Sequence, residues 1–300
     1  GVLLSNASRE VMELAEKSSI PIATTLLGIG GVPDSHQLVL GMMGMHGGSW
    51  ANHAIQDADL LIACGMRFDD RVTGNLKTYS PNSKKIHIEI DPSEINKNVK
   101  VDLAIHADLG TVLRHVNPHI KKMVRNDWLD IISGWHHDSK QRDILNLKSD
   151  KLHAAQAIRK IWEGTKGDAL IVSDVGQHQM LEAQYYEHND PRTLLTSGGL
   201  GTMGFSLPAA IGASFHEKDR GIWVIVGDGS IQMTIMELGT AIQENVNINI
   251  AIINNGYLGM VRQWQQMFYN ARYAETPISS PDYVKLAEAY GIQAYRVDSL

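Results

Sequence analysis

Gly227-Asp228-Gly229-Ser230 and Asn254-Asn255 are the stretches of sequence that decide the fold of this chain. Each comes directly after a run of apolar, often β-branched residues, 222–226 in the first case and 248–253 in the second. Residues 231–243, between the two runs, have the apolar spacing of a helix. Strand, turn, helix, strand and turn make a βαβ unit, whose crossover is right-handed almost without exception. Both strands therefore end at the same edge of a parallel sheet.

Asp228 and Asn255 are consequently expected side by side at adjacent strand ends, where open α/β sheets bind their ligands. A carboxylate and an amide oxygen suit Mg²⁺, which takes a few oxygens from protein and the rest from phosphate and water. Gly227 and Gly229 let the main chain approach an anion closely, and the helix near Ile231 directs its N–H groups at that anion. A turn of either kind, taken alone, usually has no role in binding a ligand. The two turns together predict a magnesium-diphosphate site.

The rest of the chain repeats the alternation of strand and helix, which predicts an α/β fold with two doubly wound parallel-sheet domains. Further strands are expected at residues 20–24, 60–64, 85–90 and 169–173, and further helices at 8–17, 153–161 and 208–214. We expect a first domain at residues 1–118 and a second at 151–300.

Residues 119–150 are rich in charged and polar side chains and are expected to form a solvated linker between these domains. His136 and His137 lie in this segment. They are adjacent, so they point to different sides of a helix, and no Cys or Glu stands at ligand spacing from them. A metal site at this pair is therefore disfavoured.

The composition argues against several classes of protein. The 27 basic and 33 acidic side chains form no long run of one sign, which disfavours nucleic acid as a partner. No apolar stretch reaches the roughly 18 residues of a membrane-spanning helix. Cys64 is the single cysteine, so no internal disulfide forms, and we expect a small buried side chain in a reducing compartment.

The spacing GDG-x24-NN resembles the cofactor motif of thiamine diphosphate enzymes, and residues 151–300 resemble their diphosphate-binding domain. The resemblance implies that Asp228, Asn255 and the main-chain carbonyl of Tyr257 bind Mg²⁺. It also implies that the remaining residues of the first turn contact the diphosphate, namely Gly227, Gly229 and Ser230.

Two other segments are similar to the same family. In Asp174-Val175-Gly176-Gln177-His178, the resemblance places Gln177 and His178 against the diphosphate. Gly199-Leu200-Gly201-Thr202-Met203-Gly204 resembles the loop beneath the cofactor. There the carbonyl of Gly201 would hold the 4′-amino group, and Met203 would bend the cofactor into its V shape. Taken alone, this loop is more simply a buried methionine in a glycine-rich turn.

Residues 42–47, 66–74 and 260–265 narrow the resemblance to the acetolactate synthases. That implies bound FAD in the first domain. Glu89 stands where the family commonly has aspartate, and an acid at a strand end still suits a ribose hydroxyl. By position, the candidate FAD contacts are Thr25, Leu26, Gly44, His46, Gly65, Arg67, Asp70, Glu89, Ile90, Asp108 and Leu109.

The implied reaction is decarboxylation of pyruvate and carboligation to a second pyruvate or 2-ketobutyrate, a step of branched-chain amino acid biosynthesis. Arg71 would hold the carboxylate of the second acid through paired hydrogen bonds. Trp264, Met260 and Val261 would line its pocket. The simpler alternatives are a salt bridge from Arg71 to a neighbouring aspartate, and core packing for Trp264.

Thiamine diphosphate enzymes also need a glutamate on a pyrimidine-binding domain, which these residues do not contain. The chain begins with glycine and ends just after a strand-like run at residues 293–297. We expect a fragment, inactive by itself, that also lacks a C-terminal tail. The whole protein is expected to form a homodimer or tetramer, with a regulatory subunit as a further partner. A bacterial protein would be cytoplasmic, and a eukaryotic one would lie in an organelle.

Two alternatives remain. The chain could belong to another thiamine diphosphate carboligase or decarboxylase, such as glyoxylate carboligase, or be a non-catalytic nucleotide-binding module derived from one. A nicotinamide-dependent oxidoreductase lacks support, because Gly28-Ile29-Gly30-Gly31 does not fit the pattern G-x-G-x-x-G.

Overall fold

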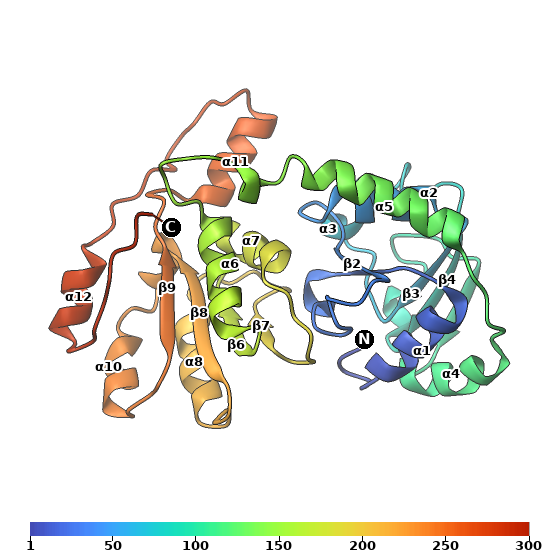
Figure 1. Ribbon diagram of the computed structural model, residues 1–300, viewed down its shortest axis with the longest axis horizontal. Helices are drawn as coiled ribbons and strands as arrows, with labels where there is room; N and C mark the ends of the chain where they lie inside the picture. The colour runs from blue at the N-terminus through green and yellow to red at the C-terminus, as the bar shows by residue number, and fades with distance from the viewer. Residues whose placement is uncertain (300) are drawn as a thin grey trace. The chain divides into compact units, whose positions relative to one another are not determined.

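The computed structural model describes residues 1–299. They form two compact units (Figure 1). The first unit comprises Gly1–Asn146 and the short return segment Glu187–Arg192, and the second comprises Leu147–Tyr186 and the residues from Thr193 onward. Each unit is an α/β structure whose paired strands are all parallel, as the sequence predicted.

The second unit is built on a four-stranded sheet in the order β7-β6-β8-β9. Its strands, in chain order, are β6 (Ala169–Ser173), β7 (Leu194–Thr196), β8 (Gly221–Gly227) and β9 (Asn249–Ile253). Helices cover both faces, so β6 is buried throughout and β8 is buried over most of its length, and both are largely apolar. These helices are α6 (Ala154–Thr165), α7 (Gln177–Tyr185), α8 (Ser206–Ser214) and α10 (Glu237–Gln243).

Alternate residues of the central strands serve opposite faces, with the period of two that a pleated strand imposes. Val172 and Val224 belong to the apolar cluster that includes Leu207 of α8 and Leu238 of α10. Ile171 and Ile225 belong to the opposite cluster, which includes residues of α6 and α7.

The single helix expected at residues 231–243 is replaced in the structure by two helices with a turn between them. The short α9 (Asp228–Ile231) begins at the aspartate of the GDG motif, and a turn separates it from α10. The turn is held by Thr234, whose hydroxyl donates to the carbonyl of Gly204 at 3.1 Å. Gly204 has a φ of +86°, and a Cβ at this position would lie 3.0 Å from the Cβ of Met233. Close packing of the two loops therefore interrupts the helix.

In the first unit, β1 (Ile22–Thr24) pairs with β2 (Val39–Met42), and a second sheet has the order β3-β4-β5. The latter strands are Leu60–Cys64, Lys84–Glu89 and Leu103–His106. Apolar clusters join the strands to α1 (Ser8–Ser18) and α4 (Leu109–Val116), and separately to α2 (Ser49–Asp57). Cys64 packs beside the first of these clusters, and burial raises the pKa of its thiol to about 11.

The segment expected to be a solvated linker contains α5 (Asn126–Lys140), which packs on α2. The ring of His136 lies 4.5 Å from that of Trp50, and Trp135 lies 5.4 Å from His53. These aromatic contacts make α5 part of the first unit, which extends to Asn146. The linker expectation is therefore corrected for most of its length.

Two other features differ from expectation. Residues 293–297 form no strand, and Tyr295 and Val297 there are largely exposed. The segment Glu187–Arg192 joins the first unit, where the main-chain N–H of His188 donates to Asp34 at 2.8 Å.

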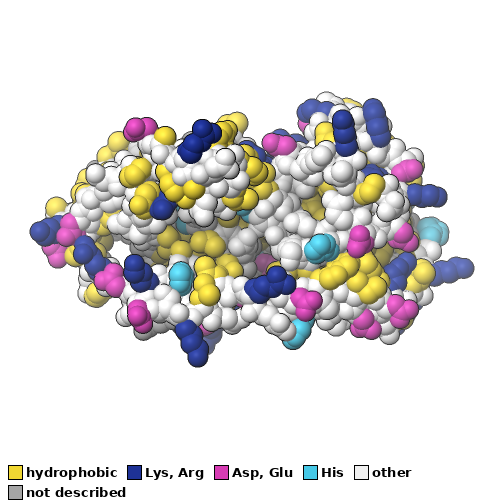
Figure 2. All heavy atoms as spheres, turned by 90° about the horizontal axis from the view of Figure 1, so that it is seen from above, with side chains coloured by type: hydrophobic (Ala, Val, Ile, Leu, Met, Phe, Trp, Pro, Cys, Tyr) yellow, Lys and Arg dark blue, Asp and Glu magenta, His cyan; other side chains and the backbone are white. Residues whose placement is uncertain are grey.

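The surface shows no concentration of one charge on the face drawn in Figure 2, where basic and acidic side chains are interspersed. Within residues 1–299, none of the helices has the length and apolar character needed to cross a membrane.

Asp174 holds the strand-end loops of the second unit together. Its carboxylate, at the end of β6, is fully buried. Oδ1 accepts from the main-chain N–H of Val175 at 2.8 Å and of Gly204 at 2.9 Å. Oδ2 accepts from the N–H of Ser206 at 2.8 Å and from its hydroxyl at 2.7 Å. One carboxylate thus fixes the glycine-rich loop and the start of α8 against the sheet.

Replacing Asp174 by Asn is expected to lower the free energy of unfolding by about 3 kcal/mol, because an amide N–H₂ would face donors in a buried site. Denaturant unfolding of the two proteins measures the difference. Asp168→Asn is the control, since Asp168 is exposed and forms one ion pair with Arg220 at 3.3 Å. Equal losses for the two variants would contradict the role of Asp174.

Candidate functional site

The GDG and NN turns meet at one edge of the sheet of the second unit. β8 and β9 are hydrogen-bonded neighbours, and Gly227 stands opposite Ile253 in their parallel register. Asp228 and the asparagine pair therefore follow directly on adjacent strands. The juxtaposition predicted from the βαβ pattern is confirmed.

Asp228 is almost fully buried, with 2% of its surface exposed. Oδ2 accepts from the N–H of Gly256 at 3.0 Å and from the hydroxyl of Ser280 at 3.0 Å. Tyr283 donates its hydroxyl to the main-chain oxygen of Asp228 at 2.8 Å. Oδ1 receives no hydrogen bond from residues 1–299. The carboxylate is thus held by one oxygen, and the other is left for a ligand.

Asn255 and Tyr257 supply further oxygens at this edge. The Oδ1 atom of Asn255 accepts from the N–H of Tyr257 at 2.9 Å. The loop is anchored on both sides of Tyr257, by Leu258 N–H to the carbonyl of Thr276 at 2.8 Å and by Ile278 N–H to the carbonyl of Gly256 at 2.9 Å. A carboxylate, an amide oxygen and a main-chain carbonyl are the hard ligands that Mg²⁺ prefers.

A cage made wholly of protein ligands is absent from the described part of the chain, where no three His, Cys, Asp or Glu residues cluster as metal ligands would. Mg²⁺ does not need one, because it usually keeps water and phosphate oxygens in its coordination shell. The donor set at Asp228 and Asn255 therefore fits Mg²⁺ that arrives with a phosphate ligand.

His178 fills the space beside the GDG turn. A Cβ at Gly227 would lie 2.8 Å from Nδ1 of this ring, and a Cβ at Gly176 would lie 2.8 Å from its Cε1. The sequence explained Gly227 by close approach to an anion, whereas the structure shows an imidazole against it. Burial lowers the pKa of His178 to about 4. Its buried Nε2 has no partner among residues 1–299, so it remains available to a ligand.

A pocket of about 590 Å³ opens beside Asn255. Among the residues that line this pocket, four have amide side chains and one, Arg262, is charged. The guanidinium of Arg262 lies 3.9 Å from the ring centroid of Tyr257, which holds it in place. The lining residues are Gln177, Asn255, Tyr257, Gly259, Arg262, Gln263, Gln266 and Met267. This chemistry favours an anionic ligand.

Gln177 connects α7 to α11 (Gly259–Phe268) across this pocket. Its Nε2 donates to Oε1 of Gln263 at 2.9 Å. Gly259 leaves room for this side chain, because a Cβ there would lie 2.2 Å from Oε1 of Gln177 and 2.8 Å from Nδ2 of Asn255. Glycine at the start of α11 is therefore required for Gln177 to sit beside Asn255.

The loop at residues 199–204 reaches the GDG turn through Met203. A Cβ placed on Gly229 would lie 3.6 Å from Cε of Met203, with Leu258 and Ile278 closer still. Gly201 adopts a φ of +65°, which favours glycine. The structure thus places the side chain of Met203 beside the GDG turn.

Helix α11 presents the residues expected to line a substrate pocket. None of its residues is fully buried, and Val261 is about half exposed. Trp264 is partly exposed and lies 5.0 Å from the ring of Phe268, and Met260 is also partly exposed.

In the first unit, several candidate nucleotide contacts lie at strand ends. The N–H of Gly65, after β3, donates to the carbonyl of Ile88 in β4 at 2.8 Å. Glu89, at the end of β4, is buried, and its Oε1 accepts from the N–H groups of Ile90 at 2.8 Å and Asp91 at 3.0 Å. Ile90 is largely exposed.

Asp108 and Leu109 have structural roles at the start of α4. Asp108 caps the helix by accepting from the N–H of Thr111 at 2.8 Å, and that bond lowers the pKa of its carboxyl group. Leu109 is buried in the core with Leu113. Only the main chain of Leu109 remains for contact with a cofactor.

The other candidates surround the loop between β2 and α2. Gly44 has a φ of +95°, and a Cβ there would lie 2.4 Å from the carbonyl oxygen of Arg71, so only glycine fits. Asn52 bonds both the N–H and the carbonyl of Gly44, at 2.8 and 2.9 Å. Burial and the nearby charge of Arg71 lower the pKa of His46. Thr25 precedes the short 3₁₀ turn Leu26–Gly28.

Arg71 lies in α3 (Asp70–Thr73), and Arg67 lies just before it. Arg71 pairs with Asp70 at 3.6 Å, and Arg67 pairs with Asp69 at 3.4 Å. The salt bridge considered from sequence for Arg71 is therefore present. Its two side chains are 60% and 80% exposed. A pair this exposed stabilises the fold by only about 0–1 kcal/mol. This contribution to stability does not explain why an arginine stands at position 71.

Several residues of the site were missed from sequence. Asp174 could have been recognised, because it directly follows a buried strand, as Asp228 does. Arg262 lies within a stretch that was noticed, but its contact with Tyr257 depends on how α11 packs. Ser280 and Tyr283 come from a segment without strand or motif, and nothing in the local sequence marks them as partners of Asp228.

Two family models match this chain. Residues 1–116 match the central domain of thiamine pyrophosphate enzymes, and residues 174–300 match their C-terminal TPP-binding domain. Together the matches cover most of both compact units.

Similar proteins are acetolactate synthases. The large subunit from Buchnera aphidicola subsp. Schizaphis graminum is 44% identical over 97% of this chain and 52% of its own length. The isozyme 3 large subunit from Escherichia coli K12 is 42% identical with the same coverage. The enzyme from Mycobacterium bovis is 44% identical over 99% of this chain and 50% of its own. The chain thus spans about half the length of the curated relatives it matches.

The family assignment inferred from GDG-x24-NN and the narrower resemblance to one group of enzymes agree with these matches. Both family models are named for thiamine pyrophosphate, and the second is a domain that binds it. The chain belongs to the thiamine pyrophosphate enzyme family, as a homologue of the acetolactate synthase large subunits.

Proposed function

We propose that this chain is the FAD-binding and diphosphate-binding portion of an acetolactate synthase. In this proposal the whole protein decarboxylates pyruvate and joins the product to a second pyruvate or to 2-ketobutyrate, in branched-chain amino acid biosynthesis. The observation that carries the proposal is the pair Asp228 and Asn255 at adjacent ends of β8 and β9. The relatives, which are acetolactate synthases at 42–45% identity, support it.

Asp228, Asn255 and the carbonyl of Tyr257 hold Mg²⁺ in this proposal. The burial of Asp228 and its bonds from Gly256 and Ser280 fix one carboxylate oxygen, so the other meets the metal without losing side-chain entropy on binding. Gly227, Gly229 and Ser230 surround the metal-bound diphosphate of thiamine diphosphate, which when bound supplies the electron sink for decarboxylation.

Gln177 and His178 contact the diphosphate from α7. The unpartnered Nε2 of His178 supports a ring nitrogen that is open to a ligand, and burial, which lowers the pKa of this residue to about 4, favours the neutral ring. The carbonyl of Gly201 and the side chain of Met203 would orient the rest of the cofactor. These assignments rest on the family resemblance and on the place of Met203 beside Gly229.

In this proposal FAD binds the first unit, at Thr25, Leu26, Gly44, His46, Gly65, Arg67, Asp70, Glu89, Ile90, Asp108 and Leu109. Gly44 and Gly65, with φ values of +95° and +60°, give the main chain sharp bends after β2 and β3, where this proposal places the ligand. Leu109 takes part through its main chain, because its side chain is in the core.

Arg71 binds the carboxylate of the second 2-keto acid, and Trp264, Met260 and Val261 shape the pocket for its alkyl group. A guanidinium recognises a carboxylate through two parallel hydrogen bonds. The partly exposed positions of the three apolar residues on α11 support a lining role.

We further propose that the whole protein is a homodimer or tetramer that works with a regulatory subunit. The large-subunit names of the relatives support a second type of subunit. The bacterial origin of these relatives favours a cytoplasmic location.

Binding of thiamine diphosphate is expected to require Mg²⁺ and to be lost on EDTA treatment. Asp228→Asn is expected to weaken Mg²⁺-dependent binding at least about 100-fold, the upper range for loss of a supporting bond at metal sites. Isothermal titration with thiamine diphosphate, with and without Mg²⁺, measures this.

Asn255→Ala is expected to weaken binding in the same way, and Asn249→Ala is its matched control. Asn249 is the same residue type at the opposite end of β9, where it bonds the carbonyl of Ile222 at 3.4 Å. If Asn255→Ala bound the cofactor like the Asn249 variant, the proposed metal site would be wrong.

Arg71→Ala is expected to raise the KM for the second keto acid about 30-fold, since a hydrogen-bonded charge pair contributes about 2 kcal/mol. Affinity for thiamine diphosphate is expected to stay unchanged. Carboligation by the full natural polypeptide, assayed with pyruvate alone and with added 2-ketobutyrate, measures the effect.

Arg9→Ala serves as the control for loss of a surface guanidinium, because the side chain of Arg9 is 88% exposed. An unchanged KM in the Arg71 variant would remove Arg71 from the acceptor site. Absence of any acetolactate from the wild-type polypeptide would instead reject the proposed reaction.

A further inference from the structure

The loop that follows β3, residues 65–69, presents main-chain N–H groups without acceptors. Among residues 1–299, nothing accepts a hydrogen bond from the N–H groups of Met66, Arg67 or Phe68. Main-chain N–H groups left open in this way can donate hydrogen bonds to an anion. The guanidinium of Arg67 belongs to the same loop, where it also pairs with Asp69 at 3.4 Å.

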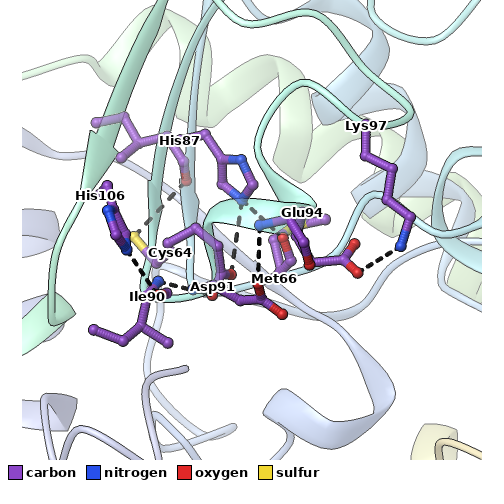
Figure 3. Close-up of polar contacts among 11 residues, drawn as sticks. Cys64, Met66, His87, Ile90, Asp91, Glu94, Lys97 and His106 are labelled. Atoms are coloured by element: carbon purple, nitrogen blue, oxygen red, sulfur yellow. Dashed lines mark hydrogen bonds and ion pairs between the residues drawn. The ribbon is translucent and has the colours of Figure 1, made fainter.

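Three successive carbonyl groups of the same loop accept hydrogen bonds. The carbonyl of Met66 bonds Nε2 of His87 at 2.9 Å, and the carbonyl of Phe68 accepts from Nδ2 of Asn98 at 2.8 Å. Between them, the carbonyl of Arg67 accepts from the N–H of Asp69 at 2.8 Å. Figure 3 shows His87 reaching from β4 to Met66.

His87 is fully buried. Its ring lies 5.1 Å from that of Phe68, at an interplanar angle of 70°. A carbonyl oxygen can only accept, so Nε2 carries the hydrogen in this bond. The other nearby group, Oε2 of Glu89 at 3.8 Å, is also an acceptor. Nδ1 is buried without a partner among the described residues, so the polar function of this ring is its bond to Met66.

Fixing the Met66 carbonyl also fixes the direction of the next N–H group. The two belong to one planar trans peptide, in which C=O and N–H point in opposite directions. Because the carbonyl of Met66 points at the buried ring of His87, the N–H of Arg67 points away from it. A side chain inside the sheet thus orients a donor on its edge.

We propose that His87 is a positioning residue for a nucleotide diphosphate: together with Asn98, it holds loop 65–69 so that the open N–H groups and Arg67 meet the anion. This inference rests on the proposed binding of FAD in the first unit. Neither His87 nor Asn98 touches the ligand in this arrangement. Both act through the carbonyl groups that they bind.

His87→Gln and His87→Leu separate the hydrogen bond from simple packing. The amide nitrogen of glutamine takes the place of Nε2 and keeps a donor for Met66, whereas leucine removes it. FAD titration, followed by quenching of flavin fluorescence, is expected to give a Kd within about threefold of wild type for His87→Gln. For His87→Leu, loss of a bond to a buried carbonyl is expected to raise the Kd about tenfold.

Leu113→Ala is the matched control for loss of stability. Leu113 is buried in the core of the same unit and lies outside loop 65–69. Its replacement is expected to lower the Tm without changing the Kd for FAD measured well below that Tm. If His87→Leu and Leu113→Ala changed the Kd equally for the same loss in Tm, His87 would be merely structural.

Hydrogen exchange in the absence of flavin tests His87 independently of FAD. Amides of residues 65–69 are expected to exchange faster in His87→Leu than in wild type or His87→Gln. Asn98→Ala is expected to have a similar effect, and it keeps the test decisive if His87→Leu does not fold. Unchanged exchange in these variants would overturn the positioning role, whereas failure of the wild type to bind FAD would reject only the proposed flavin site.

Discussion

The parallel register of β8 and β9 is the constraint on which the candidate metal site depends. Gly227 stands opposite Ile253, so the turn after each strand begins at the same level of the sheet. A shift of one residue would turn the side chains of β9 to the opposite faces. It would also move Asn255 away from Asp228 along the strand by about 3.3 Å, more than a metal–oxygen bond length. Ile252 and Ile253 of β9 pack on two different apolar clusters, which opposes such a shift.

The parts predicted well from sequence have local signals. Leu60–Cys64 and Ala169–Ser173 are continuous apolar strands, and both have the predicted bounds. The GDG and NN turns follow such strands, so the topology of one βαβ unit was enough to place them together. Short edge strands such as Leu194–Thr196 were missed, because three residues give no periodicity and depend on their pairing partner.

Features that depend on packing between distant segments could not be predicted in this way. His136 is polar and was assigned to a solvated linker, but its ring lies against Trp50, 86 positions earlier in the chain. Ser280 and Tyr283 reach Asp228 from a segment that contains no strand. From sequence, the glycine at position 227 was explained by close approach to an anion, whereas the group that a side chain there would meet is the ring of His178. In each case the partner is fixed by tertiary structure.

The two units use one physical device at their strand ends. A loop at the edge of a parallel sheet leaves main-chain groups without ladder partners, and those facing the interior need side chains to bond them. The carboxylate of Asp174 accepts hydrogen bonds from the inward-facing N–H groups of Gly204 and Ser206. The ring of His87 donates one to the inward-facing carbonyl of Met66. Satisfying the inner groups fixes the peptide planes, and each plane then directs its other group outward. Buried polar residues that bind no ligand can therefore decide which donors and acceptors the edge offers to one.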